Sequence, residues 1–390
     1  MNIGFITLVW LVSLLRIAGC DDPKGHLQPL GSHMPPIKID VIDTPPTPQE
    51  FFEKYIKVNK PVVIKGAAKV FSNFKTWQDD EYLKKKYGKW LAPVEVGKYE
   101  KKIVLIPFKV FLRNYNKHPI CISRDIVPLN PMRDELSLMQ SMSCGGYRER
   151  IVRVMFLLSS GSGQSALRWN NEENMHCMLD GTKNWTIIHR NDRHILPSHS
   201  QMPMYSAVDP RSVDMYKHPV MQDIHWYQAF VEAGDCLFVP NNSPYYVKSR
   251  DSRNLGFSVW FAAPRSLSLK DCPEKEADVP NSAPIGRSMI SEVEFVKSIF
   301  YTMIDDRTDK VSSFDFHSSS KIPSMDIESR LLLFDILDLN DDDSISADEI
   351  ESISDLSDSI WKDLIYDQDE YKELEEEKKT DETGKDKTEL

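Results

Sequence analysis

The sequence predicts an α+β fold, in which a strand-rich domain precedes a smaller all-α domain. The chain has 390 residues, more than one ordinary domain needs, and 41% of them are hydrophobic, enough for a buried core. A proline-rich stretch, 266–286, divides regions of opposite charge: residues 1–285 carry 36 basic and 29 acidic side chains, and residues 286–390 carry 12 and 30. Apolar residues recur at helical spacing on both sides of an acidic loop near residue 340.

Residues 1–20 are expected to be a signal peptide. Ile3 to Leu15 is apolar apart from one threonine and one serine, is short for a bilayer span, and is followed by the small residues Ala18-Gly19-Cys20. No lysine or arginine precedes the apolar run, so an uncleaved anchor is the alternative. Residues 21–48 are rich in proline and are expected to form an extended linker.

The end of the chain predicts where the protein resides. Lys387-Thr388-Glu389-Leu390 resembles the Lys-Asp-Glu-Leu retrieval signal, which a receptor reads. Together with a signal peptide it indicates the lumen of the endoplasmic reticulum, with the retrieval receptor as one partner and no transmembrane segment after cleavage. The charge distribution argues against a nucleic-acid binder and favours cations or basic partners for the acidic part.

Residues 49–265 are expected to form a β-barrel, because they contain ordered blocks typical of one family. Phe51–Gly66 reads F-F-E-K-Y-I-K-V-N-K-P-V-V-I-K-G, the stretch from Ser165 reads S-A-L-R-W-N-N-E-E-N, and the stretch from Gly234 reads G-D-C-L-F-V-P. These blocks resemble the JmjC (cupin-like) 2-oxoglutarate oxygenases. The resemblance implies the double-stranded β-helix, or jelly roll, of that family, with helices before it.

The three iron-ligand positions of that family are substituted here. Relatives have His-x-Asp where this chain has Arg168-Trp169-Asn170, and a final histidine where it has Tyr245. Ferrous iron in such sites needs two imidazoles and a carboxylate. A guanidinium has no lone pair to give, and the amide and the phenol are neutral at neutral pH. The resemblance thus implies an oxygenase fold in which iron and 2-oxoglutarate are not expected to work as a pair.

Three other positions match those at which relatives hold 2-oxoglutarate: Ser165, Asn174 and Lys183, the last matching the lysine that pairs with the distal carboxylate. Lys183 follows the tight-turn sequence D-G-T, so a solvated lysine is the alternative. Arg168 has alternatives as well: it can face outward, or pair with one of the adjacent glutamates, 172 and 173.

His176 shares a strand face with Asn174. We favour a satisfied core histidine over a displaced metal ligand at this position. Tyr245, Tyr246 and Trp260 are expected to fill space rather than to form a substrate cage, because aromatic rings readily occupy the volume that an absent cofactor leaves.

A second motif lies at residues 338–349, which read D-L-N-D-D-D-S-I-S-A-D-E. It resembles the twelve-residue EF-hand loop, with side-chain oxygens at positions 1, 3, 5 and 9, a backbone carbonyl at 7 and a bidentate glutamate at 12. The resemblance implies calcium ligands at Asp338, Asn340, Asp342, Ser344, Ser346 and Glu349. Position 6, normally glycine, is Asp343, which must adopt a positive φ at some cost. The alternative is an acidic helix-turn-helix that binds nothing.

Ile304 to Phe316 has the shape of a partner loop, with Val311 at position 8. Its first ligand position is an isoleucine and its last is Asp315, so it is expected to be structural and to bind calcium poorly. Residues 287–364 are therefore expected to form an EF-hand pair, and residues 365–390 an acidic tail.

Five cysteines remain after signal cleavage, so at least one stays outside intrachain disulfides. We expect a bridge between Cys121 and Cys144, which flank the loop region before the barrel, and we expect Cys177 and Cys236 to be core strand residues. Two N-glycosylation sequons are present. The one at Asn241 is the expected carrier, because the one at residue 184 lies at a strand start.

These observations favour a calcium-binding luminal protein whose JmjC-like barrel is a non-catalytic recognition or scaffold module for secretory client proteins. The alternative is an Fe(II)/2-oxoglutarate-dependent protein hydroxylase of the secretory pathway with unconventional ligands. The absence of a His-x-Asp or His-x-Glu near a family-like strand argues against it. A third possibility is binding of a dicarboxylate without turnover.

Overall fold

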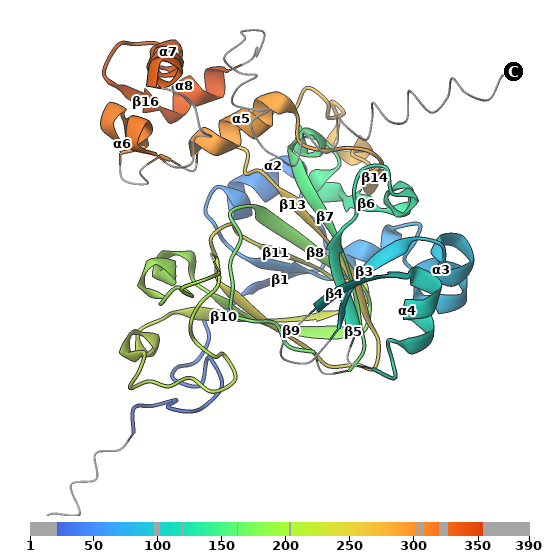
Figure 1. Cartoon of the computed structure of the whole chain (residues 1–390). Helices are drawn as coiled ribbons and strands as arrows, with labels where there is room; N and C mark the ends of the chain where they lie inside the picture. Colours follow the sequence, from blue (N-terminus) through green and yellow to red (C-terminus); the bar gives the residue numbers. More distant parts are fainter. Residues whose placement is uncertain are drawn as a thin grey trace, which may run out of the picture.

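A barrel of two β-sheets and a helical unit beyond one of its ends make up the described part of the chain (Figure 1). The computed structural model describes residues 22–96, 102–118, 120–161, 163–202, 204–301, 303–304, 308–319 and 327–353. The expected signal peptide, retrieval signal and acidic tail lie outside these residues.

The larger sheet has nine strands, in the order β1-β2-β11-β8-β13-β7-β5-β3-β4, and β1 and β2 are parallel whereas the other neighbours are antiparallel. In that order the strands are Asp40–Ile42, Val62–Ile64, Cys236–Val239, Glu173–Asp180, Asn254–Phe261, Ile151–Ser159, Ile120–Asp125, Leu91–Val96 and Lys102–Pro107. The smaller sheet is antiparallel in the order β10-β9-β12, which are Trp226–Glu232, Thr182–Ile188 and Tyr245–Ser249.

Strand β8 is buried on both faces, so its polar side chains Glu173, Asn174 and His176 lie in the interior together with its apolar ones. Met178 packs with Trp185 of β9 in the barrel interior, between the two sheets. Met175 and Leu179 pack on the opposite face of the large sheet, in the core that the N-terminal helices cover. Because successive side chains alternate between faces, Asn174 and His176 share the interior face with Met178.

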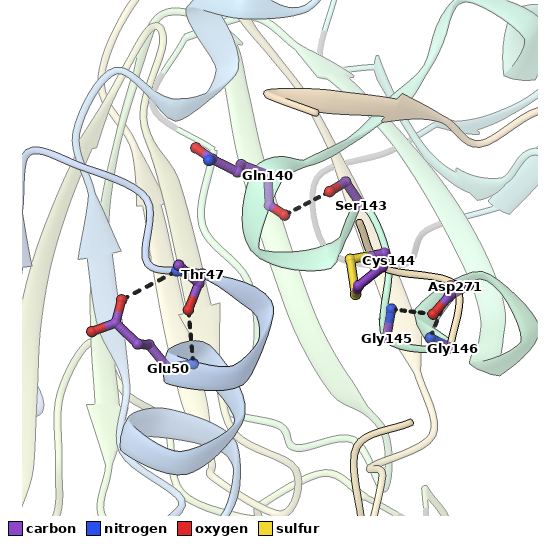
Figure 2. The surroundings of a disulfide bond; sticks show 9 residues. Thr47, Glu50, Gln140, Ser143, Cys144, Gly145, Gly146 and Asp271 are labelled. Atoms are coloured by element: carbon purple, nitrogen blue, oxygen red, sulfur yellow. Dashed lines mark hydrogen bonds between the residues drawn. A yellow bond between two sulfur atoms is a disulfide. The ribbon is translucent and has the colours of Figure 1, made fainter. Parts of the chain in front are cut away.

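Helices before the barrel cover the outer face of the large sheet: α2 (Pro48–Phe51), which continues as a π-helical turn over Phe52–Ile56, α3 (Asp80–Tyr87) and α4 (Phe108–Asn114). Helix α2 begins with a capping box, in which Thr47 and Glu50 bond reciprocally to each other's backbone N–H (Figure 2). This layer agrees with the helices that the resemblance implied before the barrel.

Residues 22–48 are not a separate linker. The N–H of Leu27 donates to the carbonyl of Val213 at 2.8 Å, the indole of Trp226 donates to the carbonyl of Met34 at 3.0 Å, and Leu30 is buried. Strand β1 pairs with β2. The prolines exclude a helix here, but they leave enough backbone donors and apolar side chains for the segment to pack on the barrel.

The predicted bridge between Cys121 and Cys144 is wrong: Cys144 forms a disulfide with Cys272 (Figure 2). The carboxylate of Asp271 accepts hydrogen bonds from the N–H groups of Gly145, at 2.8 Å, and Gly146, at 3.3 Å, on the same loop. Strand β14 (Ser282–Pro284) then pairs with β6 (Ser137–Met139). The expected linker at 266–286 is therefore also fastened to the barrel.

A second disulfide joins Cys177 to Cys236, which are directly opposite each other on β8 and β11. The sequence correctly indicated core strand positions for both, but not that the two strands are neighbours. The thiol of Cys121 remains outside the disulfides and lies 3.6 Å from a carboxylate oxygen of Glu95.

The helical unit comprises α5 (Glu292–Tyr301), β15 (Lys310–Ser312), α6 (Ser313–Ser318), α7 (Ile327–Leu337), β16 (Ser344–Ser346) and α8 (Ala347–Ser352). It has its own apolar core around Phe300 and Phe316. Strands β15 and β16 are antiparallel. Ion pairs attach the unit to the barrel: Arg150 to Glu294 at 2.5 Å and Arg265 to Asp309 at 2.7 Å. None of the helices in the described ranges has the length and apolar character to cross a membrane.

Candidate functional site

Arg168, Asn170 and Tyr245 lie together in the barrel. Arg168 and Tyr245 bond through their backbones in both directions, at 3.1 and 2.7 Å, so the two residues are adjacent across an antiparallel bridge. The amide of Asn170 donates to the phenol oxygen of Tyr245 at 3.1 Å, and the guanidinium of Arg168 lies 5.6 Å from the centre of the Tyr245 ring. The structure thus brings together the three substituted positions.

This group of side chains does not fit ferrous iron. Its one cation, the guanidinium, repels a metal, and Asn170 and Tyr245 already bond to each other. Across the residues that the structure describes, no group of three or more histidine, cysteine, aspartate and glutamate side chains is placed to hold a metal ion.

Arg168 has no carboxylate partner in the described ranges. Its Nη1 lies 3.4 Å from the hydroxyl of Tyr205, and its Nε is buried without a hydrogen-bond partner. Neither Glu172 nor Glu173 forms the ion pair that the sequence left open. Glu173 is buried and accepts a hydrogen bond from the N–H of Asn241 at 2.8 Å.

Lys183 is a buried cation on β9, with 6% of its surface exposed, so the solvated alternative is wrong. Its Nζ lies 3.4 Å from Nε2 of His176, and no ion pair with a carboxylate is found in the described ranges. Burial lowers the pKa of Lys183 to about 8, although the nearby Cys121 opposes this shift.

His176 is a core histidine, as favoured from the sequence. Its Nδ1 lies 2.8 Å from the hydroxyl of Ser258, and the ring is fully buried. Burial, followed by the charge of Lys183, lowers the pKa of His176 well below its usual value. The imidazole is therefore neutral, and its Nε2 is the atom that lies next to the ammonium group of Lys183.

Trp185 lies between the two cationic positions. Its ring centre is 5.1 Å from that of His176 and 5.2 Å from that of Tyr245. Its indole N–H is buried without a hydrogen-bond partner, as is the side-chain oxygen of Asn174 on the interior face of β8. The sequence analysis missed Trp185, although its spacing of two from Lys183 places both on one strand face.

Ser165 lies beside β12. Its hydroxyl accepts a hydrogen bond from the N–H of Val247 at 2.9 Å and donates to the carbonyl of Ala166 at 2.9 Å. These bonds hold the segment before Arg168 alongside β12, and none of them reaches the interior cluster of Lys183 and His176.

The acidic loop, defined as Asp338–Glu349, connects α7 to α8 through β16. Glu349 bonds to both ends of this loop: Oε1 accepts from the N–H groups of Leu339 and Asn340, and Oε2 accepts from the N–H and hydroxyl of Ser346. The φ angle of Asp343 is +59°, as expected for position 6.

Two features of the neighbouring segment bear on the acidic loop. Val311 of β15 pairs with Ile345 of β16, so the residues at position 8 of the two loops are neighbours. Lys310 forms an ion pair with Asp342, so a lysine head from one loop lies at a carboxylate of the other. The hydrogen bond to Asp342 raises the pKa of Lys310.

Comparison with known proteins agrees with the barrel. The model of the family described as "Cupin-like domain" matches residues 121–266. The chain is 25% identical over 240 residues to JmjC domain-containing protein D of Dictyostelium discoideum, covering 54% of each chain. It is 21% identical over 256 residues to Jumonji C domain-containing protein 5 of Drosophila melanogaster, covering 61% of this chain and 63% of that one. Residues 121–266 therefore match a cupin-like domain, and the relatives named here are JmjC-domain proteins.

The residues described above divide between the cupin-like domain and the segment beyond it. Arg168, Asn170, Lys183 and Tyr245 lie inside the matched range, and the acidic loop lies outside it. The chain spans about half to just under two thirds of the length of these curated relatives.

Two further likenesses cover similar shares of the chain. Lysine-specific demethylase 8 of Danio rerio is 25% identical over 236 residues, covering 55% of this chain and 56% of that protein. The solved structure described as "X-Ray structure of E. coli ycfD" overlaps 56% of this chain and 53% of its own, with 16% identity and a TM-score of 0.38.

Proposed function

We propose that this chain is a calcium-binding protein of the endoplasmic-reticulum lumen whose cupin-like domain holds no iron and acts as a recognition or scaffold module for secretory client proteins. One observation carries the non-catalytic part of the proposal: the Arg168 guanidinium stands at the first iron-ligand position, in contact with the residue at the last one, Tyr245. A permanently charged group there opposes the binding of a divalent cation.

The calcium part of the proposal rests on the acidic loop and its neighbour, which we assign to an EF-hand pair. The donors Asp338, Asn340, Asp342, Ser344, Ser346 and Glu349 are all oxygen ligands, as Ca²⁺ prefers. The positive φ of Asp343 supplies the turn that glycine usually makes. The pairing of β15 with β16 gives the loop the partner that EF-hands have.

Calcium binding requires this loop to rearrange. The carboxylate of Glu349 now caps backbone N–H groups at both ends of the loop, and Asp342 is paired with Lys310. A bound cation would exchange some of these hydrogen bonds for metal–oxygen contacts, so affinity is set by the difference between the two arrangements. We therefore expect weak binding, with a dissociation constant of roughly 10⁻⁴ to 10⁻³ M, on the scale of extracellular modules.

Metal analysis of the purified full-length protein tests both parts at once. We expect one calcium per chain at millimolar calcium, no stoichiometric iron, and no conversion of 2-oxoglutarate to succinate. Stoichiometric iron together with succinate formation that a chelator abolishes would instead establish the Fe(II)/2-oxoglutarate-dependent hydroxylase. If the helical unit is folded but no calcium binds, the calcium part of the proposal is wrong and the acidic loop only connects α7 to α8.

The proposed luminal location and the retrieval receptor as partner rest on the two terminal signals. Deleting Lys387 to Leu390 should send the protein into the culture medium, whereas replacing these residues with Lys-Asp-Glu-Leu should retain it. A truncated form that stays bound to membranes would favour an uncleaved anchor. Glycosidase treatment should lower the mass of the retained protein, with Asn241 as the expected carrier, and Asn241→Gln should remove that shift.

A further inference from the structure

Strand β4 is the last strand of the nine-stranded sheet, and in the described ranges no strand pairs with its outer edge. Its register with β3 is regular, and the N–H of Phe108, the next residue, donates to the carbonyl of Trp90 at 2.7 Å. Because hydrogen-bonded and non-hydrogen-bonded pairs alternate in an antiparallel ladder, every second residue counted back from Phe108 bonds to β3. Ile103 and Leu105 lie between those positions, so their backbone N–H and C=O groups point to the open edge.

The side chains at this edge are apolar and exposed. Ile103 and Leu105 share one face of β4 and are 60% and 65% exposed. Leu91 of β3 is exposed on the same face, opposite Pro107. Sheet edges in folded proteins are normally blunted by charges or covered, because an open apolar edge accepts a strand from another chain. The outer edge of β4 has this property.

Cations lie on the other face of the same strands. Helix α4 packs there, since its Phe111 shares a core cluster with Val94 of β3 (Figure 1). Lys109 and Arg113 are one turn apart on the exposed side of α4, and Lys102 shares this face of β4 by alternation. None of these three cations forms an ion pair with a residue of the described ranges. The carboxylate on β3, Glu95, is already paired with Arg124 at 3.0 Å.

These properties favour an extended acidic peptide over other partners. A second copy of this chain would bring the same cations to the same edge, and like charges across an interface repel. A membrane of anionic lipids offers negative charge but no backbone groups to pair with those of Ile103 and Leu105. An added strand supplies the backbone groups, and its side chains alternate between the apolar face and the cationic face.

We propose that the open edge of β4 binds an extended segment of a secretory client protein as an added strand, and that this segment alternates apolar and acidic residues. Its apolar side chains pack beside Ile103 and Leu105, and its carboxylates lie near Lys102 and the two cations of α4. The inference rests on the proposed function in taking the partner to be a client protein. The surface itself depends neither on calcium nor on the absence of iron.

Fluorescence anisotropy on the full-length protein tests the proposal with a labelled peptide, Glu-Val-Glu-Ile-Glu-Val-Glu. We expect one peptide to bind per chain, and the peptide with lysine in place of every glutamate to bind about tenfold or more weakly. Affinity for the acidic peptide should fall as salt is raised, because the cations are exposed.

Two pairs of variants separate the backbone from the charges. Leu105→Pro removes the N–H at the open edge, where proline is tolerated, and should weaken binding about tenfold or more, whereas Leu105→Ala keeps the N–H and should weaken it about two- to fivefold. The double variant Lys109→Glu, Arg113→Glu should weaken binding about tenfold or more. Lys270→Glu, Lys275→Glu makes the same charge change at exposed positions after the barrel strands and should leave affinity unchanged.

Hydrogen exchange on the wild-type protein tests strand addition without any substitution. Bound peptide should slow exchange of the Ile103 and Leu105 amides about tenfold or more and leave that of Val104, which already bonds to β3, unchanged. Peptide binding without this protection would refute an added strand. Self-association that Leu105→Pro abolishes, or peptide binding seen only after residues 365–390 are deleted, would assign the edge to a second copy or to the chain's own tail and overturn the proposal.

Failure of this inference is distinct from failure of the proposed function. A protein that binds calcium and holds no iron, but binds no acidic peptide, refutes the docking edge and leaves the proposed function intact. Stoichiometric iron with succinate formation refutes the non-catalytic function whether or not the peptide binds.

Discussion

The side-chain amide of Asn170 donates a hydrogen bond to the phenol oxygen of Tyr245, 3.1 Å away. Two positions that carry iron ligands in JmjC oxygenases therefore satisfy each other in this chain. Arg168 is held beside them by backbone hydrogen bonds to Tyr245, so the three side chains are neighbours.

Restoring the ligands should therefore restore metal binding. We expect the triple variant Arg168→His, Asn170→Asp, Tyr245→His to bind one Mn²⁺ or Fe²⁺ per chain, because two imidazoles and a carboxylate would then share one site. Titration calorimetry with Mn²⁺ measures this. The double variant that keeps Arg168 is the matched control and should bind no metal. Failure of a folded triple variant to bind would show that the strands do not hold ligand geometry.

Ionisation of the buried Glu173 should make the free energy of unfolding depend on pH between about 4.5 and 8. Burial raises the pKa of Glu173 to about 8, against the lowering effect of the Asn241 N–H. Between about 4.5 and 8 the folded state holds a proton that the unfolded state has lost, so the free energy of unfolding should fall as pH rises through this window. Glu173→Gln should remove the fall, gaining on the order of several kcal/mol at pH 8 and little at pH 4.5.

Urea unfolding of wild type and Glu173→Gln at several pH values measures this difference. Glu172→Gln, at the adjacent and less buried position, is the control. If Glu173→Gln raises the free energy of unfolding equally at pH 4.5 and pH 8, the substitution acts through packing and not through ionisation.

Ionisation of Lys183 should make the free energy of unfolding rise with pH above about 8, the opposite of the trend expected for Glu173. Burial lowers the pKa of Lys183 from 10.5 to about 8, so between these values the unfolded state binds a proton that the folded state lacks. The free energy of unfolding should therefore rise with pH across this window and lose that contribution as pH falls through about 8. Lys183→Met should be more stable than wild type at pH 7, by on the order of 2 to 3 kcal/mol, with the gap closing toward pH 10.

Calcium binding should respond in opposite directions to two substitutions. Glu349→Gln removes the bidentate ligand and should abolish binding. Lys310→Met removes a cation that competes for Asp342 and should raise calcium affinity about two- to fivefold, the modest range expected of an exposed ion pair. Calorimetry reports both, with Lys275→Met as the exposed control. Two equivalent calcium sites per chain would contradict the structural role assigned to Ile304–Phe316.

Local patterns predicted part of this fold. The family-like block around residue 170 indicated the strand that carries His176, and the spacing of the acidic loop indicated the positive φ of Asp343. Pairing of cysteines depends on which strands become neighbours, which spacing alone does not encode, so Cys144 with Cys272 was missed. Lys183 was ambiguous because a turn followed by a lysine looks alike whether the strand faces solvent or a barrel interior.

The two disulfides are nested along the chain: the 59-residue separation of Cys177 and Cys236 lies wholly within the 128-residue separation of Cys144 and Cys272. A ribosome makes both members of the inner pair before it reaches Cys272. The inner bond can therefore close while β12 and β13 are still to be made. The outer bond can form only on a chain in which every strand of the two barrel sheets has already been synthesised.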